Sequence, residues 1–427
     1  MNLQKHKNTL IFLSILLLAF VLRLFYLSHE SIWLDEGISI AMAKLNFAQL
    51  IDKSVIDSFP PLYYLLLHYW MLLLGDSELS VRFLSLVFGL ASIVVSYQLT
   101  KYLWQEKVAL ITAFLLAISV FHIEYAQEAR MYSLLTFLSV SSFYFFLKWK
   151  DSAAKKWMFL LFLINLLFLY THTLAVFFIA AQNIYYFLLK KKGAIVVKSW
   201  IILQLLLLLA FLPWIQIFLL QASVWQNMVW MPAPTIRDIA GTLSTYSGSI
   251  LLTLVFCVLI LKALIHYKKE QLKFNFFVFW LAFPTALLLV FCFLFQSIYL
   301  QKYTIASSLP FFILVAYGIQ SFEQKKHKIG MLSAITILAA IKLAVYYAQE
   351  DKEQWREAVA LVESNADKND VILFDAAYCK HNAFDYYVKR SDLNKLPLID
   401  VREELNESNI LRLDSLSAKA KSTWLVL

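Results

Sequence analysis

Long apolar runs recur along this chain of 427 residues and constrain its fold more than any other feature. Hydrophobic side chains make up 61% of the residues and charged side chains only 16%. A soluble core cannot hide that much apolar surface, whereas segments of about 17 to 25 mainly apolar residues can cross a bilayer. We therefore expect a polytopic α-helical membrane protein.

About eleven of these runs are long enough to be candidate spans. They cover residues 10–27, 81–103, 108–122, 130–148, 157–171, 173–189, 199–220, 247–266, 274–297, 303–320 and 329–347. A further run, from Pro61 to Gly75, is short and carries His68 among tyrosine and tryptophan residues. Such a run suits an interfacial helix better than a span. The basic start MNLQKHKN is followed by no small-residue cleavage site, so the first run is predicted to be retained.

Lysine positions indicate which way the chain crosses the membrane. Cytoplasmic loops of membrane proteins collect lysine and arginine, and leaving residues 61–75 at the outer surface puts the lysine clusters inside. These clusters lie at residues 5–7, 101–107, 148–156, 190–198, 262–273 and 325–328. The net charge of +9 therefore calls for no nucleic-acid partner. We expect a multi-pass protein of the cytoplasmic (inner) membrane, with its N-terminus in the cytoplasm.

The stretch SIWLDEG, residues 31–37, lies in the predicted first outer loop, residues 28–80. Its adjacent carboxylates, Asp35 and Glu36, have two interpretations. Acidic residues are common at outer membrane edges, so the pair could simply be solvated. Alternatively, one carboxylate is a general base or metal ligand near the bilayer surface, where partial desolvation and a like charge raise its basicity.

Phosphate-binding cations are predicted on the same outer face. The stretch HIEYAQEARMY brings Glu124, Glu128 and Arg130 together, and Lys302 lies at the same depth in YLQKY. A guanidinium at a helix edge is a bidentate phosphate ligand, while Glu128 could equally form a structural ion pair. Carboxylates and cations on one face, open to lipid, suit a phospholipid-like substrate.

Two further residues, Asp57 and His172, are weaker candidates for the site. Asp57 lies in the first outer loop before the double proline of IDSFPPLYY, which can start a helix and hold Asp57 close to the membrane surface. His172, in YTHT, sits at the tip of a tight outer hairpin. Taken alone, a histidine there is more often an incidental polar residue than a ligand.

The tail, residues 351–427, differs in composition from the lysine-rich loops and is predicted to form a small α/β domain on the outer face. Residues 351–370 have helical spacing, and DVILFDAAY is typical of a buried strand. The final STWLVL resembles another strand with nothing after it, so we expect a domain that is abbreviated or truncated. The three cysteines suggest neither a disulfide framework nor a metal site.

Four stretches in this order resemble a known family. They are W-L-D-E in the first outer loop, D-S-F-P-P-L-Y-Y after it, S-V-R-F-L-S at the second span and E-A-R-M-Y-S after the third. They are similar to motifs of bacterial relatives of protein O-mannosyltransferases and lipid A aminoarabinose transferases, membrane glycosyltransferases of the GT-C superfamily (families 39 and 83). The resemblance covers about residues 20–320, and Q-W-R-E-A-V at 354–359 is similar to the start of their outer domain.

The resemblance implies a role for individual residues. Asp35 matches the general base, with Glu36 as its partner. Donor phosphate binding is implied for Arg82, Arg130 and Lys302 with the neighbouring Tyr303; the additional candidates are Asp57, Glu124, Glu128, Tyr132 and His172. Relatives often have a histidine where this chain has Phe59, which speaks against a histidine-assisted role or metal site in that loop.

The activity implied by the resemblance is transfer of a sugar from a polyprenyl-phosphate (undecaprenyl-phosphate) donor to a lipid, glycan or protein acceptor, with inversion in a single displacement. The fold implied is a GT-C module over residues 1–350 followed by the outer domain. No cofactor is certain; a divalent metal ion could assist, without a recognisable ligand set. The alternatives are a secondary transporter, which the few Gly and Pro residues disfavour, and an inactive scaffold partner.

Overall fold

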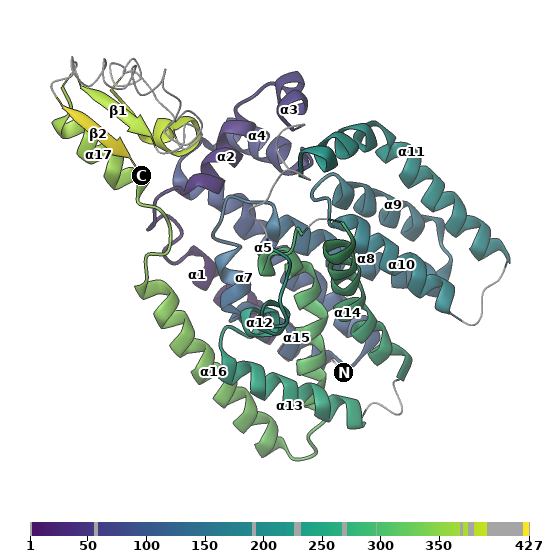
Figure 1. Ribbon diagram of the computed structural model, residues 1–427. Coiled ribbons are helices and arrows are strands. Elements are labelled where there is room, and N and C mark those ends of the chain that lie inside the picture. The colour runs from purple at the N-terminus through teal and green to yellow at the C-terminus, as the bar shows by residue number, and fades with distance from the viewer. Residues whose placement is uncertain are drawn as a thin grey trace.

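The computed structural model of this chain describes residues 2–54, 59–189, 194–225, 232–266, 271–295, 297–367, 370–374, 380–390 and 422–426. Within these ranges the protein is almost entirely helical (Figure 1). The helices of the main body are α1 (Asn2–Leu24), α2 (Leu34–Ala43), α3 (Phe47–Ser54), α4 (Leu62–Leu74), α5 (Glu78–Leu103), α6 (Glu106–Ala117), α7 (Val120–Glu124), α8 (Tyr132–Ser152), α9 (Lys155–Leu169), α10 (Ala175–Leu188), α11 (Ala194–Trp225), α12 (Ile236–Ser247), α13 (Ile250–His266), α14 (Gln271–Leu294), the 3₁₀ turn η2 (Gln301–Thr304), α15 (Ile305–Gln320) and α16 (Lys325–Ala348).

The prediction of a polytopic helical membrane protein is confirmed. Every predicted run contains a helix, and six helices in the described residues are long and apolar enough to cross a membrane. The bent pair α12 and α13, which meet at 89° near Gly248, makes a seventh if it is counted as one span. Several other helices, such as α6 and α9, are shorter, so the count of about eleven spans stays a prediction.

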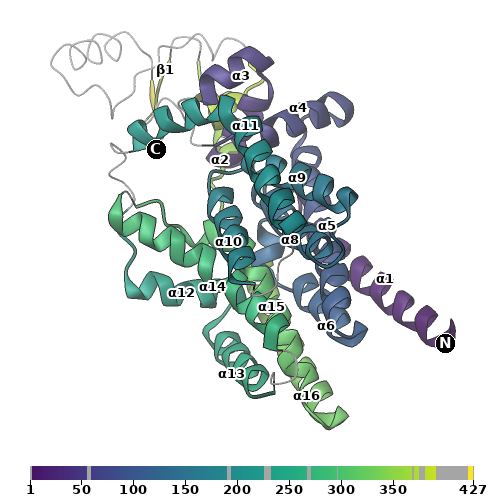
Figure 2. The same ribbon diagram turned by 90° about the vertical axis from the view of Figure 1, so that its right-hand side faces the viewer.

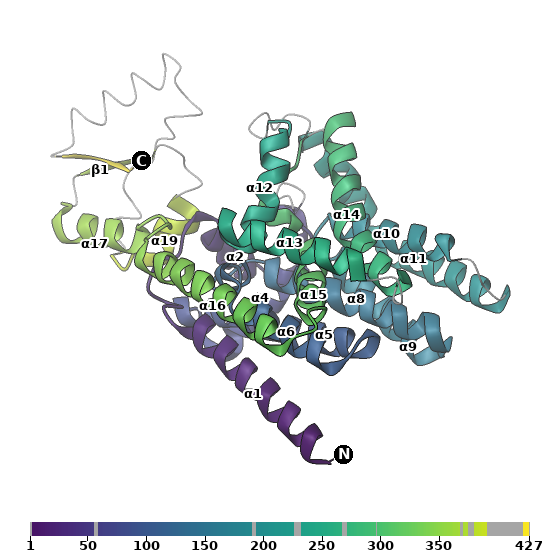
Figure 3. The same cartoon turned by 90° about the horizontal axis from the view of Figure 1, so that it is seen from below.

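Helix α15 forms the centre of the bundle. It contacts α6, α8, α13 and α14, and 83% of its most apolar window is buried. By contrast, α1 and α16 bury only 22% and 17% of theirs and lie at the periphery. Figure 2 shows α1 at the edge of the body, and in Figure 3 it protrudes with the N-terminus at its far end. Its exposed leucines suit contact with lipid.

The connection between α1 and α5 holds three short helices, α2, α3 and α4. Helix α4 begins directly after Pro61, as the double proline predicted, and it is too short to be one of the six candidate spans. It packs against both α2 and α5, its Tyr63 and Tyr64 side chains are buried, and the Tyr63 hydroxyl shares a hydrogen bond with Ser85 of α5 at 3.0 Å. Helix α2, which carries the two adjacent carboxylates, is thereby held against the end of the bundle.

The C-terminal part contains α17 (Trp355–Asn365), β1 (Val371–Phe374), the π-helical turn η3 (Lys380–Phe384), α19 (Asp385–Tyr387) and β2 (Thr423–Val426). The strands pair in parallel, with Val371 opposite Thr423 and Phe374 opposite Val426. Trp355 and Val359 of α17 form a small hydrophobic core with Ile372 and Phe374 of β1. The predicted domain over residues 351–427 stays a prediction, because residues 391–421 lie outside the described ranges.

A close backbone contact joins this C-terminal part to α2. A Cβ atom on Gly37 would lie 2.2 Å from the carbonyl oxygen of Asn382 in η3. Only glycine permits that approach, so the last residue of the SIWLDEG stretch is explained by packing rather than by chemistry.

We expect Gly37→Ala to destabilise the protein, because the new methyl group forces α2 and η3 apart. The expected cost is about 1 to 3 kcal/mol, measured as a lower unfolding midpoint in detergent. Gly330→Ala in α16 is the control, since a Cβ there meets nothing within 4 Å. Equal stability of Gly37→Ala and wild type would contradict the close contact.

Candidate active site

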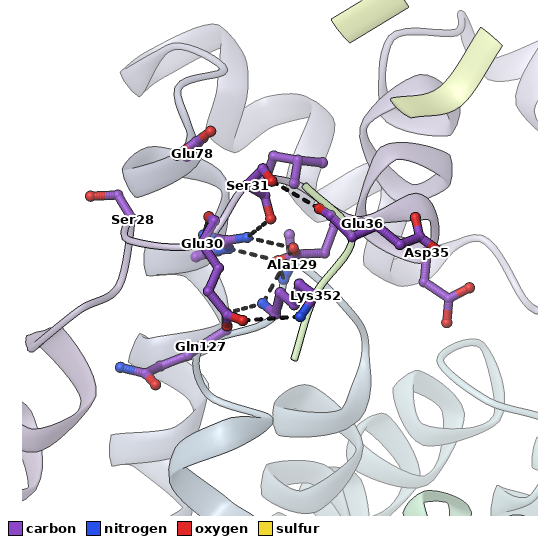
Figure 4. A network of polar contacts seen from close by, with 12 residues as sticks. Ser28, Glu30, Ser31, Asp35, Glu36, Glu78, Gln127, Ala129 and Lys352 are labelled. Carbon is purple, nitrogen blue, oxygen red and sulfur yellow. Dashed lines mark hydrogen bonds and ion pairs between the residues drawn. The ribbon is translucent and has the colours of Figure 1, made fainter. Parts of the chain in front are cut away.

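The two adjacent carboxylates of α2 have different surroundings. Glu36 is fully buried, and Arg82 of α5 pairs with it through Nε at 2.8 Å and Nη2 at 2.6 Å. The backbone N–H of Ala129 donates to Oε1 at 2.8 Å, and Lys352 Nζ lies 3.4 Å from Oε2 (Figure 4). Burial would raise the pKa of Glu36, but the charges of Arg82 and Lys352 and these hydrogen bonds outweigh it and lower the pKa to about 2.

Arg82 holds this arrangement together. Besides its two bonds to Glu36, it donates to the carbonyls of Leu27 at 3.0 Å, Glu30 at 2.8 Å and Ser31 at 2.9 Å. All five N–H donors of the guanidinium are therefore used within the protein. The expectation that Arg82 binds the donor phosphate does not fit this geometry; Arg82 instead fixes the chain that leads into α2.

Asp35, one residue earlier, is partly exposed and only loosely paired. Its Oδ2 lies 3.6 Å from Arg130 Nη2 and 3.4 Å from Lys302 Nζ, and 26% of the side chain is exposed. Arg130 Nη1 also donates to the carbonyl of Asp35 at 3.1 Å. In Figure 4 the Asp35 side chain points away from the network around Glu36. The structure thus brings together three predicted residues from distant parts of the chain.

Aromatic rings surround the two cations. The Arg130 guanidinium lies 5.2 Å from the centre of the Phe59 ring, and Lys302 Nζ lies 5.6 Å from the rings of both Trp33 and Tyr132. Such rings stabilise a cation while leaving it able to pair with an anion. Phe59 therefore contributes to the surroundings of the Arg130 guanidinium.

His172 and Tyr303 form one wall of the same site. The His172 ring lies 5.4 Å from the Tyr303 ring and 5.0 Å from the Phe59 ring. Burial, with the charges of Arg130 and Lys302, lowers the pKa of His172 to about 3, so the ring is neutral. Because Nδ1 accepts from the Leu174 N–H, the proton is assigned to Nε2, which has no hydrogen-bond partner among the described residues.

Glu124 and Glu128 lie in the segment that leads to Arg130, and both are largely buried. Burial raises the pKa of each carboxyl to about 7. The negative charge of Glu128 also raises the pKa of Glu124, and that of Glu36 raises the pKa of Glu128. The positive charge of Lys352 lowers both pKa values but does not outweigh burial. Glu124 lines a pocket of about 590 Å³ that also borders Lys302, with Tyr125, Asp238 and Gln301 in its wall.

Two expectations stay predictions. Asp57 lies outside the described residues. For the metal ion, no three Asp, Glu, His or Cys side chains group into a plausible metal site within the ranges that the structure describes.

Several neighbours of the site carried no recognisable signal in the sequence. Lys352 follows the last long helix in an acid-rich stretch, and nothing in its spacing points to Glu36. Trp33 and Phe59 are ordinary aromatic residues of a membrane loop until the fold places them against Lys302 and Arg130. Only W-L-D-E, read as a unit, could have indicated the role of Trp33.

Comparison with known proteins agrees with this fold. The family model of dolichyl-phosphate-mannose-protein mannosyltransferases matches residues 58–217. No curated protein sequence matches the chain. The crystal structure of ArnT from Cupriavidus metallidurans in the apo state matches with a TM-score of 0.58 at 14% identity, covering 84% of this chain and 66% of that one. ArnT bound to undecaprenyl phosphate matches with a TM-score of 0.56 at the same identity and the same coverage of both chains.

The oligosaccharyltransferase AglB from Archaeoglobus fulgidus, in complex with an inhibitory peptide and a dolichol-phosphate, matches with a TM-score of 0.60 at 10% identity, covering 93% of this chain and 64% of that one. The chain thus spans slightly less than two thirds of the length of both proteins. These likenesses confirm the expected fold: the chain has the GT-C fold.

The two carboxylates should differ sharply in their effect on stability. Glu36→Gln leaves Arg82 buried without its counter-charge, and breaking a buried pair in this way costs about 3 to 5 kcal/mol. Asp35→Asn removes a partly exposed, loosely held charge and should cost no more than about 1 kcal/mol. Unfolding midpoints of both variants in the same detergent measure the difference; equal losses would contradict the division between a buried structural carboxylate and a loosely paired one.

Proposed function

We propose that the protein is a membrane glycosyltransferase that moves a sugar from a polyprenyl-phosphate donor, of the undecaprenyl-phosphate type, to a lipid, glycan or protein acceptor. The convergence of Asp35, Arg130 and Lys302 carries this proposal, because it joins a partly exposed carboxylate to two cations in a GT-C fold. The orientation implied by the lysine pattern would place this chemistry at the outer face of the cytoplasmic membrane.

The donor phosphate would bind to Arg130 and Lys302. Asp35 Oδ2 pairs with both cations, at 3.6 Å from Arg130 Nη2 and 3.4 Å from Lys302 Nζ. These contacts are longer than the 2.6 to 2.8 Å bonds of the Arg82–Glu36 pair, so the cations can be shared with a second anion at modest cost. Similarity to ArnT bound to undecaprenyl phosphate supports a lipid phosphate as that anion.

Transfer would then proceed by a single displacement at the anomeric carbon. Asp35 takes the proton of the acceptor hydroxyl or amine while the acceptor atom forms its bond to the anomeric carbon. The bond from that carbon to the phosphate oxygen breaks, and the phosphate departs with the electron pair. Arg130 and Lys302 stabilise the negative charge that accumulates on the leaving phosphate.

The other residues would support this step. Glu36 and Arg82 position α2 rather than react, since both are buried and fully engaged. The His172 Nε2–H is a neutral donor available to the phosphate or sugar, with Tyr132 and Tyr303 beside it. The pocket that Lys302 shares with Glu124 has polar and aromatic walls, which suit a sugar ring of the donor or the acceptor.

Asp35→Asn should abolish transfer without abolishing donor binding. Loss of a general base costs about 10²- to 10⁴-fold in rate, whereas Arg130 and Lys302 remain to hold the phosphate. The measurement is transfer of radiolabelled sugar from a panel of undecaprenyl-phosphate sugars to membrane acceptors, with undecaprenyl phosphate binding measured in parallel. Asp52→Asn, an exposed aspartate of the same connection, is the matched control.

Arg130→Gln should differ from Asp35→Asn in donor binding: in the same two assays we expect weaker undecaprenyl phosphate binding as well as slower transfer, because a phosphate ligand is lost. Equal transfer by Asp35→Asn and wild type would remove Asp35 from the mechanism.

No transfer by wild type with any donor would favour an inactive scaffold or a transporter over an enzyme.

A further inference from the structure

The segment that follows α16 places a lysine inside the network of Glu36. Only 12% of the Lys352 side chain is exposed, and its Nζ lies 3.4 Å from Glu36 Oε2 and 3.3 Å from the carbonyl oxygen of Gln127 (Figure 4). A buried ammonium group is costly unless it is paired. The position of Lys352 is therefore determined by Glu36 and Gln127 together.

These two contacts connect both halves of the candidate active site. Glu36 directly follows Asp35 on α2, and Gln127 lies in the turn that leads to Arg130. The Ala129 N–H bond to Glu36 joins the same two segments at 2.8 Å. Lys352 is thus a second bridge between the segment that carries the base and the segment that carries the phosphate ligand.

Hydrogen bonds also hold the backbone of this segment at Lys352 and its two neighbours. Glu30 Oε1 accepts from the backbone N–H groups of Asp351 at 2.7 Å and Lys352 at 3.0 Å. Ser31 Oγ donates to the carbonyl of Glu353 at 2.8 Å. Lys352 is consequently fixed relative to the chain that enters α2.

Glu353, which follows Lys352, stabilises the start of α2. The N-cap residue Trp33 provides no side-chain cap, and Glu353 Oε2 instead accepts from the Leu34 N–H at 3.0 Å. A carboxylate at this position satisfies a free N–H group and is favoured by the helix dipole. Two consecutive residues of one segment, Lys352 and Glu353, therefore act on the short helix that carries Asp35.

We propose that Lys352 is a positioning residue for sugar transfer: by bridging Glu36 and the Gln127 carbonyl, it holds Asp35 at its working distance from Arg130. This inference rests on the proposed function. It assigns to the segment after the last long helix a part in catalysis, although none of its side chains reaches Asp35 among the described residues. Misplacement of a reacting group by about 1 Å can cost about 100-fold in rate.

The test compares two lysines of nearly equal burial. Lys352→Met removes the bridge while keeping the length of the side chain, and Lys352→Arg preserves the charge. Lys380→Met is the control, because the Lys380 side chain is 11% exposed and pairs at 2.9 Å with Asp385 within the C-terminal part. Each full-length variant is assayed for kcat and donor KM in transfer, for undecaprenyl phosphate binding and for its unfolding midpoint.

We expect Lys352→Met to lower kcat about 10- to 100-fold with little change in undecaprenyl phosphate binding, and Lys352→Arg to restore most of the activity. Lys380→Met should keep the kcat of wild type even if it unfolds earlier. The proposal is overturned if Lys352→Met retains kcat within about twofold of wild type, or if Lys380→Met loses as much. No transfer by wild type would overturn the proposed function and this inference with it.

Discussion

The buried ion pair between Glu36 and Arg82 is the interaction on which the arrangement of the site depends. Arg82 ties the chain after α1 to α5 through three carbonyls, and Glu36 ties α2 to the turn before α8 through the Ala129 N–H. A buried pair of this kind is tolerated only when its remaining donors and acceptors are satisfied. Here they are, and removing either partner would leave an uncompensated charge at the junction of several segments.

This constraint explains why the two adjacent carboxylates differ. On a helix, consecutive residues point in different directions, so when Glu36 points into the protein, Asp35 points away from the buried pair. Asp35 therefore remains partly exposed and faces two cations from the turn before α8 and from η2. Glu36 holds the helix, whereas Asp35 is loosely paired and partly exposed, as the proposed role of a general base requires.

The apolar runs were sufficient to predict the class of fold, and the short run after Pro61 was correctly separated from the long ones. Asp35, Arg130 and Lys302 could be named as candidates from the sequence because charges are rare in such a chain and the surrounding motifs resemble a known family, and the structure brings the three together. The structural role of Arg82 could not, since it depends on three carbonyls that have no sequence signature. Lys352 was missed for a similar reason, because its partner Glu36 lies far away in the chain and only the fold brings them together.

The most direct test of the account is a structure of the full-length protein with undecaprenyl phosphate bound. We expect the phosphate within hydrogen-bond reach of both Arg130 and Lys302, with Asp35 beside it and the Glu36–Arg82 pair unchanged. A phosphate bound elsewhere, with the contacts of Asp35 to both cations intact, would contradict it.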